Sequence, residues 1–233
     1  ADRMSRLGTE SAFQVLARAR ELEARGRDVI HLEIGEPDFD TPAHIVEAAC
    51  RALHEGWTHY TASQGIPELR NLIAEQTSHR RAQPVEPAQV VVTPGAKPIM
   101  FYTLLALAQP GREVIYPDPG FPIYKSMIDF CGAKAVPLPL REEMDFRLQV
   151  DELRSLITER TALVILNSPH NPTGGALEPS DLEAIAELCI RHNIPVLSDE
   201  VYEEILYDGS FCSIATFPGM STRERTIILH GFS

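Results

Sequence analysis

The sequence has few of the features that mark disulfide-bonded, metal-binding or membrane-spanning proteins. Its four cysteines, Cys50, Cys131, Cys189 and Cys212, are far apart and form no Cys-x-x-Cys pair. The sequence therefore predicts neither a disulfide framework nor a metal site, and it favours buried free thiols in a reducing compartment. No apolar run approaches the roughly 18 residues that a membrane-spanning helix needs.

Positive charge is also scarce. The 33 acidic and 21 basic residues give a net charge of −12. This balance argues against general binding to nucleic acids or anionic membranes, since both require basic patches. It does not exclude a local positive pocket. The N-terminal segment is polar and charged and has no signal-peptide core, so we expect a cytoplasmic protein.

The composition is that of an ordinary soluble protein, with 44% hydrophobic and 23% charged residues among 233. From about residue 89 onward, apolar runs that are typical of strands alternate with helical patterns. Such β-α-β units predict an α/β fold with a mostly parallel sheet and helices on both faces. The six predicted strands are 89–93, 113–117, 133–138, 161–167, 194–200 and 226–229. The helices predicted among them are 97–108, 122–130, 150–157 and 179–192, with a short helical segment after residue 200.

The first third of the chain predicts three helices and one short strand. A helix beginning near Ala12 ends by Gly26, and residues 29–32 are a strand candidate. A second helix is expected with Thr41 as its cap and Pro42 at its first position. Pro67 begins a third helix that runs to about residue 80.

Five loops that follow predicted strands are rich in residues that bind small polar ligands. Ligands bind at the carboxyl ends of the strands in such sheets, so five loops at one edge indicate a shared site. The loops are "TPGAK" (93–97), "PDPGFPIY" (117–124), "NSPHNPTGG" (167–175), "SDEVY" (198–202) and "HGFS" (230–233).

The first of these loops has the pattern of an anion site. Gly95 allows close approach of the backbone, and the N–H groups of Ala96 and Lys97 would point out of a helix N-terminus. The alternative is an ordinary turn between a strand and a helix, because such turns commonly contain glycine.

Three polar side chains in the later loops suggest ligand contacts. Asn171 lies in a stiff loop that would fix its amide, although a rigid turn explains the loop equally well. Asp199 ends an apolar strand, where a carboxylate is costly unless it is paired, so it is either a helix cap or the counter-ion of a buried cation. Tyr202 lies three residues later and could face the same ligand.

The six motifs "GEPDFDTP", "YTASQGIPELR", "TPGAK", "NSPHNPTG", "SDEVY" and "HGFS" carry a family resemblance. The chain resembles a pyridoxal-phosphate-dependent aminotransferase of fold type I, class I/II, and is closest to the bacterial aspartate aminotransferase branch. The resemblance covers nearly the whole chain. It implies a cofactor-binding large domain over residues 36–233, incomplete at its C-terminal end, with residues 1–35 contributing to a smaller domain.

The resemblance assigns the cofactor contacts. It implies that Asp199 pairs with the protonated ring nitrogen of pyridoxal 5′-phosphate, which strengthens the ring as an electron sink. Tyr202 and Asn171 match the groups that hydrogen-bond the phenolic oxygen, and Phe121 matches the aromatic side chain that stacks on the ring. The backbone at 95–97 matches part of the phosphate cradle.

The resemblance also assigns substrate contacts and a partner. Gly35 and Asn171 match residues at the substrate, and Lys97 matches a lysine that can approach the side-chain carboxylate of an acidic substrate, although a surface lysine is the alternative. Tyr60 matches a tyrosine that reaches the phosphate of the neighbouring subunit's cofactor, which implies a homodimer. The lysine that forms the Schiff base is expected immediately after Ser233.

The expected function is therefore transfer of an amino group between an amino acid and a 2-oxo acid, with aspartate or another acidic amino acid as the candidate donor. Two alternatives stay open. A carbon–sulfur β-lyase of the same fold would use the same cofactor residues. A non-catalytic aminotransferase-like domain that binds an effector is the third reading, although the sequence has no basic helix-turn-helix pattern.

Overall fold

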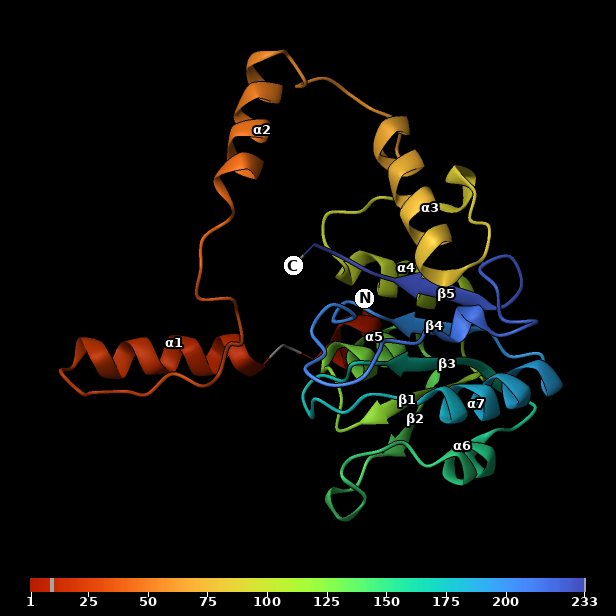
Figure 1. Ribbon diagram of the computed structural model, residues 1–233. Helices are drawn as coiled ribbons and strands as arrows, with labels where there is room; N and C mark the ends of the chain where they lie inside the picture. The colour runs from red at the N-terminus through yellow and green to blue at the C-terminus, as the bar shows by residue number, and fades with distance from the viewer. Residues whose placement is uncertain (9–10, 233) are drawn as a thin grey trace. The chain divides into compact units, whose positions relative to one another are not determined.

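The computed structural model describes residues 1–8 and 11–232, and the chain divides into two compact units (Figure 1). Residues 1–8 and 64–233 form the first unit, which holds the sheet. Residues 9–63 form the second unit, which contains α1 (Ser11–Ala24) and α2 (Ala43–His54). The prediction that residues 1–35 join a smaller domain and 36–233 a large one stays a prediction.

The first unit is built on a five-stranded sheet in which every neighbouring pair is parallel (Figure 1). The strand order is β2-β1-β3-β4-β5. The central strand β3 is buried along its whole length, as expected for a strand covered on both faces. The strands are β1 (Glu113–Asp118), β2 (Lys134–Pro139), β3 (Thr161–Asn167), β4 (Val196–Asp199) and β5 (Thr226–Leu229).

Helices cover both faces of this sheet, which confirms the predicted α/β class. Successive strand residues point to opposite faces, so Ile115 packs with one helical layer while its neighbours Val114 and Tyr116 pack with the other. One layer contains α4 (Lys97–Leu107) and α5 (Ile123–Cys131). The other contains α6 (Val150–Leu156) and α7 (Pro179–Arg191).

Local sequence signals fix several element ends. α3 (Pro67–Arg81) begins with a proline at its first position, and Glu178 forms a capping box ahead of α7. Gly132 ends α5 with a left-handed φ of 82°. The remaining elements are short 3₁₀ helices: η1 (Asp2–Arg6), η2 (Pro87–Gln89), η3 (Glu142–Met144) and η4 (Ile214–Thr216).

Two predicted strands are wrong. Residues 89–93 do not join the sheet. Their backbone groups bond elsewhere, because the Val92 N–H donates to the Gln64 carbonyl and the Arg70 guanidinium donates to the Val90 carbonyl. Residues 29–32 are not a strand either, and Ile30 and Leu32 are exposed there.

Two helix details also differ from the prediction. Pro42 is the N-cap of α2 rather than its first residue, because its backbone is extended (ψ 136°), and Thr41 lies outside the helix. After residue 200 the chain forms turns, and the next helical element is η4.

The cysteines are free, but the expectation that they are buried holds fully only for Cys189. Burial raises the pKa of its thiol to about 12. Cys50 is exposed because the described structure buries no residue of α2.

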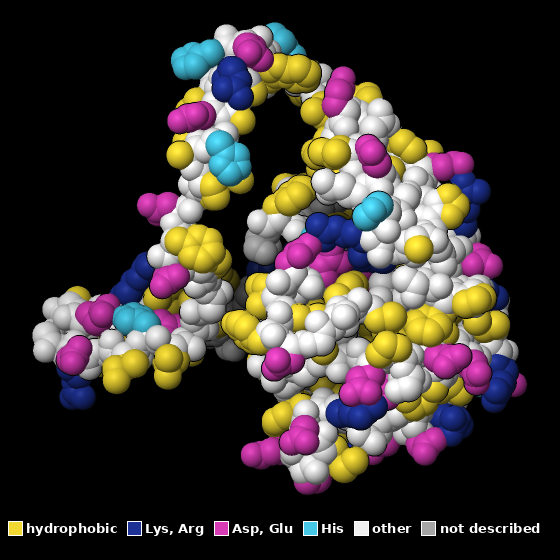
Figure 2. Space-filling model, viewed as in Figure 1, with side chains coloured by type: hydrophobic (Ala, Val, Ile, Leu, Met, Phe, Trp, Pro, Cys, Tyr) yellow, Lys and Arg dark blue, Asp and Glu magenta, His cyan; other side chains and the backbone are white. Residues whose placement is uncertain are grey.

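On the face shown in Figure 2, acidic and basic side chains are interspersed among the described residues, without a broad basic patch. Among these residues we find no helix with the length and apolar character needed to span a bilayer.

Candidate active site

The parallel strands bring the predicted ligand loops to one edge of the sheet. Asn167, the last residue of β3, is in register with Asp199, the last residue of β4. Asp199 is in turn in register with Leu229, the last residue of β5. The loops that follow these strands, and the loop that follows β1, therefore begin side by side (Figure 1).

Asp199 is a buried carboxylate, only 5% exposed. The Tyr124 hydroxyl donates a hydrogen bond of 2.5 Å to its Oδ2, and the Val201 N–H makes a long contact of 3.4 Å with Oδ1. No lysine or arginine within residues 1–8 and 11–232 forms an ion pair with it. Burial raises the pKa of Asp199, although the bond from Tyr124 acts against this rise.

The helix-cap reading of Asp199 is wrong, because residues 201–204 form turns and no helix begins there. The alternative reading, a counter-ion, agrees with its surroundings. A buried carboxylate without a cation is costly, and a bound cation at this edge would offset that cost.

Asn171 and Tyr202 come together from different loops. The Asn171 Nδ2 donates to the Tyr202 hydroxyl at 3.3 Å, and both side chains are half-buried. The pair joins the loop after β3 to the turn after β4. It places an amide donor and a phenol beside each other at the edge where Asp199 lies.

Phe121 and Lys97 extend this group of residues. The Phe121 ring packs edge-to-face on Tyr124, with centroids 5.9 Å apart. The Lys97 ammonium lies 5.8 Å from the centroid of the Phe121 ring, within the range of a cation–π contact. Lys97, Phe121, Tyr124 and Asp199 thus form a continuous series of contacts.

The loop before α4 has open space above its backbone. Gly95 has a φ of +88°, and no described atom lies within 4 Å of the position that a Cβ would take there. Ala96 is the N-cap and Lys97 the first residue of the 11-residue helix α4. The N-terminus of a helix of this length suits an anion.

Gly35 and Tyr60 belong to the second unit, where both are exposed. Their assigned contacts with substrate and with a neighbouring cofactor stay predictions.

Comparison with known proteins decides the family. Residues 27–233 match the family model for aminotransferase class I and II. The chain belongs to this family. Its members depend on pyridoxal phosphate.

The relatives are aminotransferases of several specificities. The arginine–pyruvate transaminase of Pseudomonas aeruginosa is 43% identical over 93% of this chain and 55% of that protein. The probable aspartate/prephenate aminotransferase of Aquifex aeolicus is 41% identical over 100% of this chain and 59% of its own length. The Thermus thermophilus aspartate aminotransferase structure with maleate superposes with a TM-score of 0.94 at 37% identity, covering 99% of this chain and 59% of that one. The chain thus spans less than two thirds of the relatives it matches.

Two residues of this aminotransferase-family site were missed from the sequence. Tyr124 lies in the quoted loop "PDPGFPIY", but a tyrosine on a helix is typical of packing. Asn167 is the last residue of β3 and the first residue of the motif "NSPHNPTGG". Its position as an amide at the end of an apolar strand could have marked it as a site residue. Its Nδ2 donates to the carbonyls of Pro169 and Asp199, both at 3.2 Å, and its Oδ1 accepts from the Asn171 N–H at 2.9 Å.

Replacing Asn167 by alanine is expected to destabilise the protein by about 1–3 kcal/mol, because three backbone groups lose a buried partner. Asn171→Ala is the matched control, since the Asn171 amide is half-buried and its recorded side-chain bond goes to Tyr202. It should cost clearly less. Urea unfolding of both variants measures this difference, and equal losses would contradict the assignment.

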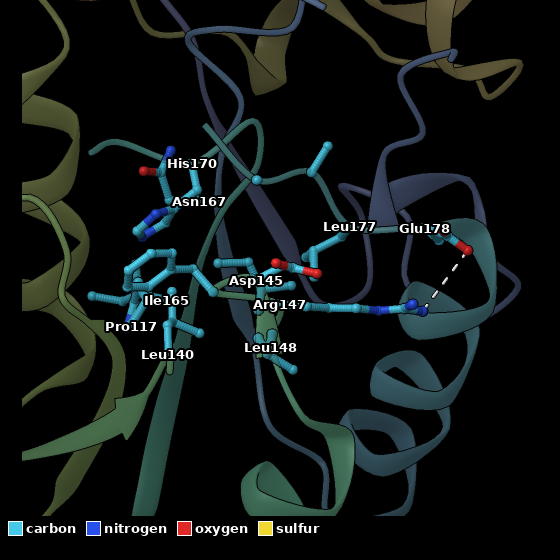
Figure 3. Close-up of a pocket in the computed structure, with 14 residues that line it drawn as sticks. Pro117, Leu140, Asp145, Arg147, Leu148, Ile165, Asn167, His170, Leu177 and Glu178 are labelled. Atoms are coloured by element: carbon cyan, nitrogen blue, oxygen red, sulfur yellow. Dashed lines mark ion pairs between the residues drawn. The ribbon is translucent and has the colours of Figure 1, made fainter. Parts of the chain in front are cut away.

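A separate cavity of about 220 Å³ lies near this edge (Figure 3). Pro117, Leu140, Ile165, Asn167 and His170 line it. Asp199 and Tyr202 do not, so the cavity adjoins the predicted cofactor site at Asn167 but is not that site. Burial lowers the pKa of His170 to about 4, and its Nδ1 lies 2.7 Å from the Thr173 hydroxyl.

A buried ionic network supports the segment that follows β4. Arg81, at the end of α3, pairs with Glu200 at 2.5 Å and with Glu203, and its guanidinium lies 5.1 Å from the Phe211 ring centroid. Glu200 also accepts from Ser198 and Ser213 at 2.7 and 2.6 Å. The network ties α3 to the residues on both sides of Asp199 and Tyr202.

Proposed function

We propose that the protein containing this chain is a pyridoxal-phosphate-dependent aminotransferase that moves an amino group between an amino acid and a 2-oxo acid. The observation that carries the proposal is the buried carboxylate of Asp199, which pairs with no lysine or arginine of the described residues and is held at the shared edge of the strand-end loops. The relatives at about 40% identity are named as aminotransferases, which favours transfer over the lyase alternative.

The donor set fits the cofactor. Asp199 would hold the protonated ring nitrogen, and the Asn171–Tyr202 pair would hydrogen-bond the phenolic oxygen. Phe121 would stack on the ring, and the N–H groups at Ala96 and Lys97 would bind the phosphate. When bound, the cofactor supplies an acceptor for the electron pair left on the substrate α-carbon as a proton leaves.

The first test is an absorbance spectrum of the full-length protein from about 300 to 500 nm, taken with pyridoxal phosphate before and after borohydride. We expect a visible band that borohydride bleaches, with the cofactor then retained by mass. No band after addition of pyridoxal phosphate would contradict the proposed function.

We also propose that the amino donor has an acidic side chain, because Lys97 stands over Phe121 at the site. Lys97→Met should then lower kcat/KM for aspartate about 10- to 100-fold, the effect of losing a hydrogen bond to a charged group, while alanine as donor is little affected. Steady-state kinetics with both donors measures the ratio. The control is Lys125→Met, which removes a lysine paired with Asp129 on the surface of α5. An equal loss for both donors would contradict the acidic preference.

Two further proposals concern the state of the protein. A homodimer is proposed from the match of Tyr60 to a tyrosine that reaches across subunits, and sedimentation of the full-length protein would test it. A cytoplasmic location is proposed from the scattered cysteines, which favour a reducing compartment, and cell fractionation would test it.

A further inference from the structure

Tyr124 is fully buried on α5, and its ring packs in the core layer formed by α4 and α5. A buried tyrosine needs a hydrogen-bond partner for its hydroxyl. That partner could have been a backbone carbonyl of the layer. Here it is the Asp199 carboxylate, which lies 75 residues away in the sequence and is itself buried.

The bond from Tyr124 is the stronger restraint on this carboxylate. An O–H···O⁻ bond of 2.5 Å belongs to the short, charge-assisted class, whereas the Val201 contact at 3.4 Å is long for any hydrogen bond. The last torsion of an aspartate is broad and has few intrinsic preferences. The orientation of the Asp199 carboxylate therefore depends mainly on the Tyr124 hydroxyl.

The same side chain also supports the predicted stacking residue. The Tyr124 ring packs edge-to-face on Phe121. One buried residue therefore contacts both Asp199, the candidate partner of the cofactor's ring nitrogen, and Phe121, the candidate that stacks on the cofactor ring. A tyrosine that served only to fill the core would need a partner for its hydroxyl, but that partner need not be the Asp199 carboxylate.

We propose that Tyr124 is a positioning residue of the cofactor site, which fixes one oxygen of Asp199 so that this carboxylate is ready for the protonated ring nitrogen of pyridoxal phosphate. This inference rests on the proposed function. Tyr124 does not itself need to touch the cofactor. It acts through Asp199 and supports Phe121.

The test is Tyr124→Phe in the full-length protein, with two ligands measured by equilibrium dialysis in the absence of substrate. One ligand is pyridoxal phosphate, and the other is its 1-deaza analogue, in which carbon replaces the ring nitrogen. The variant should bind pyridoxal phosphate about 10- to 100-fold more weakly than wild type, which is the effect of losing a hydrogen bond to a charged group. It should bind the 1-deaza analogue with the same affinity as wild type. Tyr116→Phe is the matched control, because Tyr116 is buried in the same layer and does not bond to Asp199.

A pH profile separates positioning from simple packing. Without the hydroxyl, Asp199 is protonated more readily, so the acid-side loss of pyridoxal phosphate affinity should begin at higher pH. Glu200 and His230, the other groups that act on this carboxylate, are the same in both proteins. In an Asp199→Asn background, adding Tyr124→Phe should change the affinity little, because the interaction that it removes is already gone.

The outcomes are distinct. Selective loss for pyridoxal phosphate with the shifted profile supports the inference. The inference would be overturned if Tyr124→Phe lowered the affinity for both ligands equally and by the same factor as Tyr116→Phe. It would also be overturned if Tyr124→Phe did not lower the affinity at all. Failure of the wild-type protein to bind pyridoxal phosphate would instead overturn the proposed function.

Discussion

Replacing Asp199 by asparagine is expected to lower the rate of amino-group transfer by about 10²- to 10³-fold, the size of effect seen when one preorganised electrostatic partner is removed. The asparagine side chain keeps the shape and can still accept from Tyr124, but it carries no charge for a protonated ring nitrogen. Steady-state kinetics with saturating pyridoxal phosphate measures the loss. The matched control is Asp118→Asn, at the exposed end of strand β1 of the same sheet, which should keep most of the activity.

The same substitution should not destabilise the cofactor-free protein. Burial raises the pKa of Asp199 in the folded state, so its ionisation opposes folding. This group therefore does not affect the stability of the wild-type protein below its unfolded pKa, about 4. The stability falls as the pH rises from there to the folded pKa and stays at the lower level above it. The asparagine variant has no carboxyl group to ionise, so it does not lose stability in this way. It should melt at an equal or higher temperature than wild type at pH 8, and this difference in melting temperature should vanish in acid. A variant that melts lower at pH 8 would contradict the account of a buried carboxylate whose ionisation opposes folding.

Replacing Arg81 by methionine is expected to cost about 3–5 kcal/mol of unfolding free energy, because it leaves the buried carboxylate of Glu200 without its arginine and removes one of the cations that pair with the buried Glu203. For a chain of this size the melting temperature should fall by roughly 6–20 °C. The matched control is Arg80→Met. The Arg80 side chain is 44% exposed and pairs with Glu203 and the exposed Glu204, so its loss should cost about 1 kcal/mol or less.

Acid should reduce the difference between wild type and Arg81→Met. Burial alone would raise the pKa of Glu203, but His230 and Arg81 outweigh it and lower the pKa to about 2. Because the folded-state pKa lies below the unfolded value of about 4.3, the ionised Glu203 stabilises the protein above about pH 4.3. This stabilisation is lost as the pH falls towards 2. The cost of the substitution, measured by urea unfolding, should therefore shrink below pH 4. Equal costs for Arg80→Met and Arg81→Met would contradict the role of the buried network.

The core of the site could be predicted because the sheet is parallel. The apolar runs in the sequence predicted the ends of β3 and β4 to within a residue or two. Once these strands are parallel neighbours, Asp199, Asn171 and Tyr202 must lie at one edge, whatever the details of packing. The Asn171–Tyr202 contact follows from that topology.

Other features depend on packing that the sequence does not encode locally. The bond from Tyr124 to Asp199 requires the position of α5 against β4, and a helical tyrosine alone predicts only a core residue. The segment 89–93 has the composition of a strand, but tertiary contacts with Gln64 and Arg70 take its backbone groups. The roles of Gly35 and Tyr60 stay predictions.

The most direct test of the central claim, that Asp199 holds a protonated ring nitrogen, is the ¹⁵N NMR chemical shift of ring-labelled pyridoxal phosphate bound to the full-length protein. We expect the shift of a protonated pyridine nitrogen in the wild type and of an unprotonated one in Asp199→Asn. An unprotonated nitrogen in the wild type, or the same shift in both proteins, would contradict the claim.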